Sequence, residues 1–360
     1  MKKKILFTGG GTAGHVTPNI ALFPHFKDDF DIIYLGSKNG IEKSLVNESK
    51  IKYYEISTGK FRRYFSIQNF TDPFKVIKGF IEANNIIKKE KPDIVFSKGG
   101  FVSVPVVIAA YFNKIPVVLH ESDITPGLAN KICIQFCKKV CVTFEECYNK
   151  IGSKKAVLTG SPIRDELKNG SRLLGEEFCG FKHKKPTLLL MGGSQGSVKL
   201  NSILRESLEE ILNKFNVVHL CGKNNLDKEL NNMQGYRQYE YLKGELPNIM
   251  ALADIIVSRA GSNSIFEILA LNKPNLLIPL SKKASRGDQI LNARSFEKKG
   301  YSAVLLEEDL TVERFISSVN ETYNNRDFYI KNMNSASNSE GVKKILDVIN
   351  SILFSKSISL

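Results

Sequence analysis

The fold of this chain is decided by one stretch near its start, Lys4-Ile5-Leu6-Phe7-Thr8-Gly9-Gly10-Gly11-Thr12-Ala13-Gly14-His15. Its first part, Ile5 to Phe7, is an apolar run with the length of a short buried strand, and the glycines that follow are typical of a tight turn. The first backbone N–H groups of a helix have no partner within the helix and carry partial positive charge. The stretch therefore predicts a strand, a turn and a helix start that together suit a phosphate group.

The glycine spacing Gly9-x-Gly11-x-x-Gly14 is formally that of a dinucleotide-binding turn. Such a turn is accompanied by an acidic residue about twenty positions later, at the end of the second strand, where it binds a ribose. The second predicted strand, 31–35, has its only acid, Asp31, at its beginning. No Gly-Lys-Ser/Thr sequence follows the turn, so it is not a P-loop either. These observations disfavour a nicotinamide-dependent oxidoreductase and leave a phosphate ligand open.

Strand-like apolar runs alternate with helical stretches along the whole chain, which predicts parallel α/β sheets with helices on both faces. The second half repeats the opening unit, because a strand at 187–191 is followed by a glycine turn at 192–197 and a helix at 200–215. A third polar turn, 258–264, precedes another helix. We therefore expect two Rossmann-like domains that face each other across a cleft. The expected boundaries are 1–162, 163–341 and a closing helix and tail at 342–360, with a linker or lid at 165–185.

Two further strands of the first half are expected to bring polar residues to the same sheet edge. Lys98-Gly99-Gly100 follows a strand at 92–97, and His120-Glu121-Ser122-Asp123 follows a strand at 115–119. Open α/β sheets bind their ligands at the carboxyl ends of their strands. This edge is therefore the expected binding edge of the first domain.

A helix is expected after Pro73, with apolar residues three and four positions apart. Two interpretations of these residues stay open. Either all of them face the core together with the segment 61–65, or Phe61 to Phe74 with their arginines form an exposed aromatic and basic patch for a membrane surface. The residues in question are Phe70, Phe74, Ile77, Phe80 and Ile81.

The 360-residue chain has a formal net charge of +14, and most of it lies in the first half. Residues 1–163 contain 24 Lys and Arg against 14 Asp and Glu, a net charge of +10, and the rest of the chain carries +4. This excess favours an anionic partner such as nucleic acid, a membrane surface or a phosphorylated substrate, unless it only reflects a lysine-rich proteome. The longest near-apolar run, 101–112, is too short to span a membrane. The six cysteines show no disulfide or zinc pattern and are expected to be reduced and buried.

Taken together, the turns resemble those of the MurG family of bacterial glycosyltransferases. The resemblance extends from about residue 4 to residue 300 and rests on motifs that occur in the family's order. These motifs are Gly9–His15, Lys98–Ser103, His120–Asp123, Gly160–Arg164, Gly192–Gly196 and Ala260–Glu267.

The resemblance implies a GT-B fold and an inverting transfer of N-acetylglucosamine (GlcNAc). The donor would be UDP-GlcNAc and the acceptor the C4 hydroxyl of the N-acetylmuramic acid unit of lipid I, which gives lipid II in peptidoglycan synthesis. The implied location is the cytoplasmic face of the bacterial cell membrane, on an anionic surface, as a peripheral protein with no nucleic-acid partner. The implied reaction uses no cofactor and no metal, since a helix N-terminus, a serine and an arginine can stabilise the leaving diphosphate.

The resemblance also implies site residues, carried over motif by motif. His15 is the candidate for the base or for the group that positions the acceptor, although a histidine near a helix start is as often a cap or a packing group. Asp123 is an alternative base. Ser194 would bind the UDP phosphates and Glu267 the ribose hydroxyls. The complete expected set of substrate-binding residues is Thr12, Ala13, Gly14, Arg164, Ser194, Gln195, Glu267 and Gln289.

The sequence departs from the family pattern at two positions. Asp123 stands where some members have Asn, and Asp288-Gln289 stands where a pair of glutamines is usual, so only Gln289 carries over. One alternative is another GT-B enzyme that acts on a UDP-sugar, a 2-epimerase or a glycolipid glycosyltransferase, against which the His120–Ser122 and Gly160–Arg164 motifs argue. A non-catalytic binder of nucleic acid or membrane is the other alternative, and it would leave three phosphate-type turns without a ligand.

Overall fold

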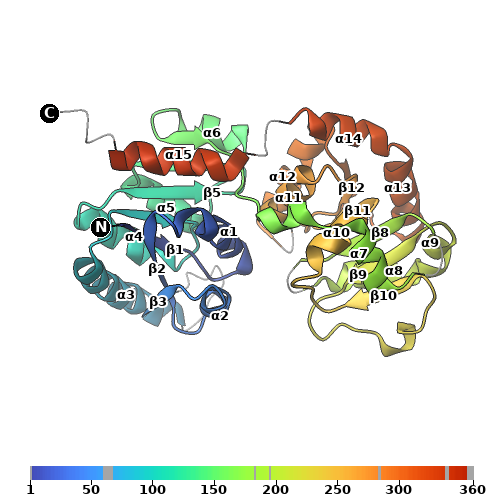
Figure 1. The fold of residues 1–360 in the computed structure, drawn as a ribbon, viewed down its shortest axis with the longest axis horizontal. Helices are drawn as coiled ribbons and strands as arrows, with labels where there is room; N and C mark the ends of the chain where they lie inside the picture. The colour runs from blue at the N-terminus through green and yellow to red at the C-terminus, as the bar shows by residue number, and fades with distance from the viewer. Residues whose placement is uncertain are drawn as a thin grey trace. The chain divides into compact units, whose positions relative to one another are not determined.

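The computed structural model describes residues 2–59, 68–181, 184–193, 196–282, 285–336 and 340–354, with residues 68–73 described without their side chains. The chain divides into two compact units, Met1–Pro162 with Glu340–Leu360, and Ile163–Ser339. Each unit contains one parallel sheet between layers of helices (Figure 1). The expected α/β class with parallel sheets is therefore confirmed.

The first unit has a seven-stranded sheet whose order reverses beside its central strand. Strands β2 and β3 lie on one side of β1, and β4 and the later strands lie on its other side. The switch point of the topology therefore lies between β1 and β4. The strands, in spatial order, are β3 (Lys52–Ile56), β2 (Phe30–Ser37), β1 (Lys3–Thr8), β4 (Ile94–Ser97), β5 (Val117–Glu121), β6 (Lys139–Val142) and β7 (Ala156–Leu158).

The core of the first unit forms between β1 and helices from both ends of the chain. Ile5 and Phe7 of β1 are fully buried and share one cluster with Phe26 of α1 and Ile349 of α15. Helix α15 follows the second unit in sequence and lies on the first unit's sheet (Figure 1). The helices are α1 (Thr17–Phe26), α2 (Ile41–Asn47), α3 (Gln68–Glu90), α4 (Ser103–Phe112), α5 (Leu128–Phe136), α6 (Glu145–Ile151) and α15 (Gly341–Phe354).

The second unit repeats this plan with six strands, and its switch point lies between β8 and β11. The strands, in spatial order, are β10 (Tyr236–Tyr239), β9 (Asn216–Leu220), β8 (Thr187–Met191), β11 (Ile255–Ser258), β12 (Asn275–Leu277) and β13 (Ala303–Val304). The helices are α7 (Arg172–Cys179), α8 (Val198–Glu206), α9 (Leu208–Lys214), α10 (Leu246–Leu252), α11 (Ser262–Ala270), α12 (Asp288–Lys298), α13 (Val312–Asn324) and α14 (Arg326–Asn334).

The segment expected to be a linker or lid, 165–185, contains instead a 3₁₀ helix (Asp165–Asn169) and helix α7. Ser171 caps α7 by accepting a hydrogen bond from the Leu174 N–H, and Gly180 ends it in the left-handed conformation. Gly175 lets α7 lie directly on α10, since a Cβ at this position would meet the Asn248 carbonyl at 2.5 Å. The expectation was wrong because the segment has no strong apolar periodicity, while the ends of α7 carry ordinary capping signals.

The helix expected at 200–215 is divided into α8 and α9 at Ser207. The Ser207 hydroxyl donates to the carbonyls of Ile203 (2.8 Å) and Leu204 (2.9 Å), so it competes with the regular helical pattern at that point. Strands β10 and β13 were not expected, since the first is polar and the second has only two residues.

Three of the four residues of the apolar series on α3 whose side chains are described are exposed, and the fourth, Phe80, is half-buried. Phe74, Ile77 and Ile81 are 74%, 58% and 52% exposed. The buried face of α3 is offset from them and includes Gly79 and Ala83, because α3 packs closely at this point: a Cβ at Gly79 would meet the Ser57 carbonyl oxygen at 2.0 Å. Phe70 and the segment 61–65 lie outside the residues whose side chains are described.

All six cysteines are free and buried, as the sequence predicts. Within the described ranges, no helix combines the length and the apolar character needed to cross a membrane.

Candidate functional site

The glycine turns after β1 and β4 pack against each other at the switch point of the first unit. The Gly10 N–H points to the Gly99 carbonyl at 3.4 Å. Gly11 and Gly100 have φ of +88° and +82°, and a Cβ at Gly100 would meet the Gly10 carbonyl oxygen at 2.2 Å. Only glycine therefore allows both the backbone conformation and the close approach.

His15 lies where these two turns meet. It ends a 3₁₀ helix (Ala13–His15), and its Nδ1 is 2.9 Å from the hydroxyl of Thr12, which orients the ring. The Cβ position of Gly100 is 3.4 Å from the ring carbon Cγ. Thr12 and Gly14 are exposed, and Ala13 and His15 are half-buried. The structure thus places the predicted residues 12–15 together at the surface of the expected binding edge.

The end of β5 carries a group of buried charges beside the predicted Asp123. The Glu121 carboxylate accepts hydrogen bonds from the Asp123 N–H (2.9 Å) and the Asn130 side chain (2.7 Å). Burial, helped by the charge of Asp123, raises the pKa of Glu121 to about 7. The Lys98 ammonium, at the end of β4, donates to the Ser122 hydroxyl, and burial lowers its pKa to about 8. Lys98 was not among the predicted site residues, although its position directly after a strand is a signal.

His120 holds the backbone rather than supplying a base. Its side chain is fully buried, and its Nε2 lies 3.0 Å from the Gly160 carbonyl oxygen. A carbonyl only accepts hydrogen bonds, so Nε2 carries the proton. Burial and the nearby Lys98 keep the pKa of His120 well below its ordinary value. This histidine is therefore neutral and ties the end of β5 to the turn at Gly160.

Ser194 and Gln195, the predicted phosphate-binding residues of the second unit, lie outside the described residues. The residues on either side of them form a tight turn after β8. Gly193 and Gly196 have φ of +94° and +77°, and the Gly196 N–H donates to the Gly193 carbonyl (3.0 Å). The Ser197 hydroxyl then caps helix α8 by accepting from the Leu200 N–H at 3.3 Å.

Two of the predicted donor-binding residues form an ion pair. The Nε and Nη2 atoms of Arg164 donate to Oε1 of Glu267, on helix α11, at 3.2 and 3.1 Å. Burial raises the pKa of Glu267, and the charge of Arg164 acts against this shift. The third, Gln289, is the second residue of helix α12 and accepts a hydrogen bond from the Leu280 N–H through Oε1 (3.1 Å).

A buried arginine that was not predicted connects the loops of this second edge. Arg259 follows β11 and is 6% exposed. Its Nη2 donates to the Ser197 hydroxyl (2.7 Å) and to the Glu307 carboxylate, and its Nη1 donates to the Ile278 carbonyl (3.1 Å). The other carboxylate oxygen of Glu307 accepts from the Ser281 N–H at 3.2 Å. Arg259 thus joins the cap of α8 to the loop after β12.

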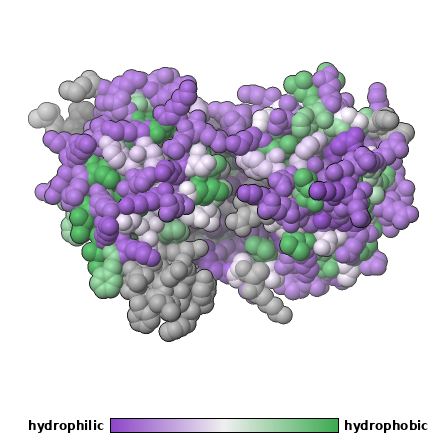
Figure 2. All heavy atoms as spheres, turned by 90° about the horizontal axis from the view of Figure 1, so that it is seen from below, coloured by the Kyte–Doolittle hydropathy of each residue, from purple (hydrophilic) through white to green (hydrophobic). Residues whose placement is uncertain are grey.

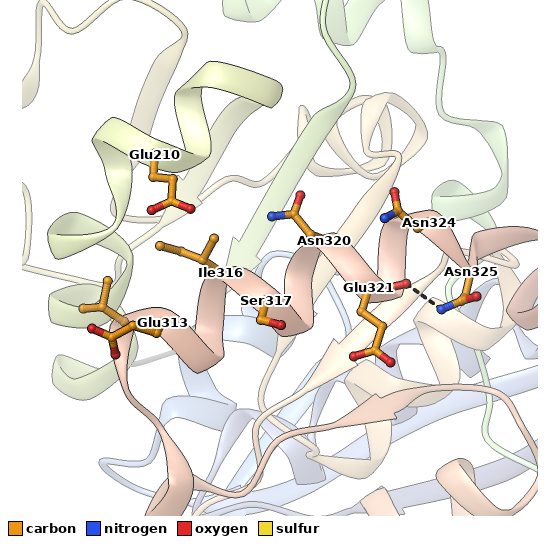
Figure 3. A pocket seen from close by; sticks show the side chains of 9 residues that line it. Glu210, Glu313, Ile316, Ser317, Asn320, Glu321, Asn324 and Asn325 are labelled. Carbon is orange, nitrogen blue, oxygen red and sulfur yellow. Dashed lines mark hydrogen bonds between the residues drawn. The ribbon is translucent and has the colours of Figure 1, made fainter.

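One hollow of the second unit lies away from these turns, between α9 and α13 (Figure 3). It is open, and acids and amides such as Glu210 and Asn320 line it. No predicted site residue reaches it, so it is not the candidate site.

Comparisons with known proteins give a consistent result. The model of the glycosyltransferase family 28 N-terminal domain matches residues 5–142, and that of the family 28 C-terminal domain matches residues 187–349. A UDP-N-acetylglucosamine–N-acetylmuramyl-(pentapeptide) pyrophosphoryl-undecaprenol N-acetylglucosamine transferase of Clostridium tetani is 61% identical over 350 residues, which cover 97% of this chain and 98% of that protein.

Two solved structures share the fold at lower identity. The crystal structure of Acinetobacter baumannii MurG has a TM-score of 0.76 and 23% identity, with 98% of this chain and all of that chain (100%) covered. The UDP-GlcNAc 2-epimerase of Neisseria meningitidis, bound to UDP-GlcNAc, has a TM-score of 0.68 and 16% identity, with 97% and 99% covered. These likenesses confirm the expected GT-B fold, which transferases and epimerases share.

Proposed function

Because this chain belongs to the MurG family within glycosyltransferase family 28, we propose that it transfers GlcNAc from UDP-GlcNAc to the C4 hydroxyl of the N-acetylmuramic acid unit of lipid I and so forms lipid II. The observation that carries this proposal is the 61% identity, along nearly the whole chain, to a relative named for this transfer. The main alternative, a 2-epimerase, is supported only by fold, at 16% identity.

In this proposal the second unit holds the donor. Glu267 accepts hydrogen bonds from the ribose hydroxyls, and Arg164 donates to the donor's diphosphate. Their ion pair supports these roles, since it holds both side chains ready at one place. The turn with Ser194 and Gln195 receives the phosphates at the N-terminus of α8.

The remaining contacts with the donor come from two other segments. Gln289 uses its carboxamide nitrogen, because its oxygen is already bound to Leu280. From the first unit, Thr12, Ala13 and Gly14 also approach the donor.

The proposed chemistry is a single inverting displacement. His15 takes the proton of the attacking hydroxyl, or positions the acceptor while Asp123 takes the proton. The hydrogen bond to Thr12 supports the role of His15, because it fixes the ring. The charge that develops on the leaving UDP is stabilised by Arg164 and by the N-terminus of α8, so the step needs no cofactor.

The test is turnover of radiolabelled UDP-GlcNAc with a lipid I analogue. We expect His15→Ala and Asp123→Asn to lower kcat by different factors. The variant that removes the base should lose about 100-fold or more in kcat at saturating donor. Glu267→Ala is expected to raise the KM for the donor about tenfold or more with kcat nearly unchanged. Glu166→Ala is the matched control, because Glu166 also contacts Arg164 (3.4 Å) but is exposed. Epimerised UDP-GlcNAc without a disaccharide product would exclude the proposal.

We further propose that the first unit binds an anionic membrane surface through an exposed patch on α3 and α4. Hydrophobic side chains gather along one edge of this unit (Figure 2). Two helices contribute rings to the patch, because the ring centroids of Phe80 and Phe112 are 6.0 Å apart in an edge-to-face arrangement. Three lysines, Lys75, Lys78 and Lys114, are close to these residues in sequence. Its exposed apolar members are Phe74, Ile77, Ile81, Tyr111 and Phe112.

Sedimentation with phosphatidylglycerol vesicles tests this membrane proposal. The double variant Ile77→Ser/Phe112→Ser is expected to lower vesicle binding about tenfold, because it removes apolar area without changing charge. Leu173→Ser, on α7 of the second unit, removes an equally exposed apolar side chain and should change nothing. Unchanged binding of the double variant would show that another surface makes the contact.

A further inference from the structure

Glu42, on helix α2, is buried inside the first glycine turn. Its side chain is fully buried, and its carboxylate accepts hydrogen bonds at both oxygens. Oε2 accepts from the Gly11 N–H at 3.2 Å, and Oε1 accepts from the Ser37 N–H at 3.0 Å and from the Ser37 hydroxyl. One carboxylate thus joins the turn after β1 to the end of β2.

The glycines around Glu42 leave room for this carboxylate. A Cβ at Gly10 would meet the carboxyl carbon of Glu42 at 2.6 Å, and a Cβ at Gly40 would meet a carboxyl oxygen at 2.2 Å. The carbonyl side of the turn is also satisfied from within, since the Tyr34 hydroxyl donates to the Gly9 carbonyl at 2.7 Å. The inside of the turn is therefore filled by the protein's own groups.

In dinucleotide-binding folds, the backbone N–H groups of this turn donate to a phosphate. We propose that Glu42 is an internal substitute for that phosphate: its carboxylate occupies the anion position of the first glycine turn and so fixes the segment Thr12–His15 for the acceptor. The inference rests on the proposed transferase function only for the last step, the effect on the acceptor.

Two consequences follow for the first unit. A phosphate cannot bind at the Gly11 N–H, because that donor is taken and a second negative charge would lie beside the first. The segment with His15 is held by a charge-assisted hydrogen bond directly before it, which is stronger than a neutral one. Glu42 is thus a positioning residue that acts on His15 through the backbone and does not touch a substrate.

The Glu42→Gln variant tests this role with little change of shape. A carboxamide has one accepting oxygen, so it cannot accept from Gly11 and Ser37 on opposite sides, and one of those donors faces an NH2 group. We expect amide hydrogen exchange in residues 9–15 to rise about tenfold, and kcat to fall about tenfold at saturating UDP-GlcNAc. The dissociation constant of UDP, measured by calorimetry, should change much less than kcat, because the proposal places most contacts with UDP in the second unit. Glu42→Asp keeps the charge but is shorter, and it should fall between Gln and wild type in kcat.

Glu48→Gln, at the exposed end of the same helix, is the matched control and should behave as wild type. Exchange and kcat that stay within twofold of wild type in Glu42→Gln would overturn the proposal. So would protection of the residue 9–15 amides by inorganic pyrophosphate in the wild type, because the turn would then still bind a phosphate. The exchange measurements do not depend on turnover. If the wild type makes no disaccharide, the transferase proposal fails, and exchange still decides whether Glu42 holds the turn.

Discussion

The turn after β1 and the turn after β8 occupy the same place in the two units, yet a carboxylate binds the first turn and a guanidinium binds the helix cap at the end of the second. Each follows the first strand of its unit and lies at the switch point of its sheet. In the first unit, the Glu42 carboxylate binds the Gly11 N–H. In the second, the guanidinium of Arg259 donates to Ser197, the cap of the following helix. A shared topology therefore does not imply a shared ligand.

The helices that follow the two turns differ in the same sense. Helix α8 begins directly after its turn, with Ser197 as its cap, so its N-terminal N–H groups stand at the turn. In the first unit a 3₁₀ helix comes next, and α1 begins only at Thr17, with Pro18 in its first turn. The charge of Arg259 and the N-terminus of α8 both favour a phosphate at the second turn. This difference between the turns supports the proposal that the second unit holds UDP.

The largest effect on the second turn is expected from removal of the cation behind it. We expect Arg259→Met to weaken UDP binding about 100-fold, because the α8 cap and the loop after β12 lose their shared donor. Although burial acts against it, the hydrogen bonds from Arg259 hold the pKa of Glu307 below its ordinary value. The variant leaves this carboxylate buried and unpaired, so the free energy of unfolding should fall by about 3–5 kcal/mol. Calorimetry with UDP and denaturant unfolding measure the two effects.

A double variant separates binding from folding. Arg259→Met/Glu307→Leu removes both charges, so most of the lost stability should return while UDP binding stays weak. Arg314→Gln is the matched control, since Arg314 pairs with Asp309 at the surface (3.2 Å) and should cost less than about 1 kcal/mol. Recovery of UDP binding in the double variant would show that the cation is dispensable.

The sequence predicted the turns because a strand, a glycine turn and a helix start are local features. It did not predict what lies inside them, because those contacts are distant in the chain. The dinucleotide pattern places an acid at the end of the second strand, whereas Glu42 stands on the next helix, 31 positions from Gly11. Arg259 was seen only as part of a polar turn, and its partners Ser197 and Glu307 are 62 and 48 positions away.

Side-chain burial was predicted less well than the elements themselves. On α3, the apolar spacing left a core-facing stripe and an exposed patch open, and in the structure the buried face includes Gly79 and Ala83 while Phe74 faces solvent. Periodicity gives the relative positions of side chains around a helix. It does not say which face meets the sheet, since that depends on how closely the neighbouring backbone approaches. The predicted roles of His15, Asp123 and Glu267 stay predictions that the kinetic variants decide.

The smallest expected effect compares the two turns directly, because it uses the same substitution at two glycines with similar φ. Gly11 and Gly193 have φ of +88° and +94°, so alanine at either position pays for a left-handed conformation, about 1–2 kcal/mol. At Gly193 the added methyl meets no atom of the described residues within 4 Å, whereas at Gly11 it meets the Phe101 ring at 2.4 Å. Gly11→Ala should therefore lose roughly 1–3 kcal/mol more than Gly193→Ala in denaturant unfolding. An equal decrease in the free energy of unfolding for both variants would mean that the first turn accommodates the methyl group as well as the second does. Glu42 and Phe101 would then not restrict its conformation.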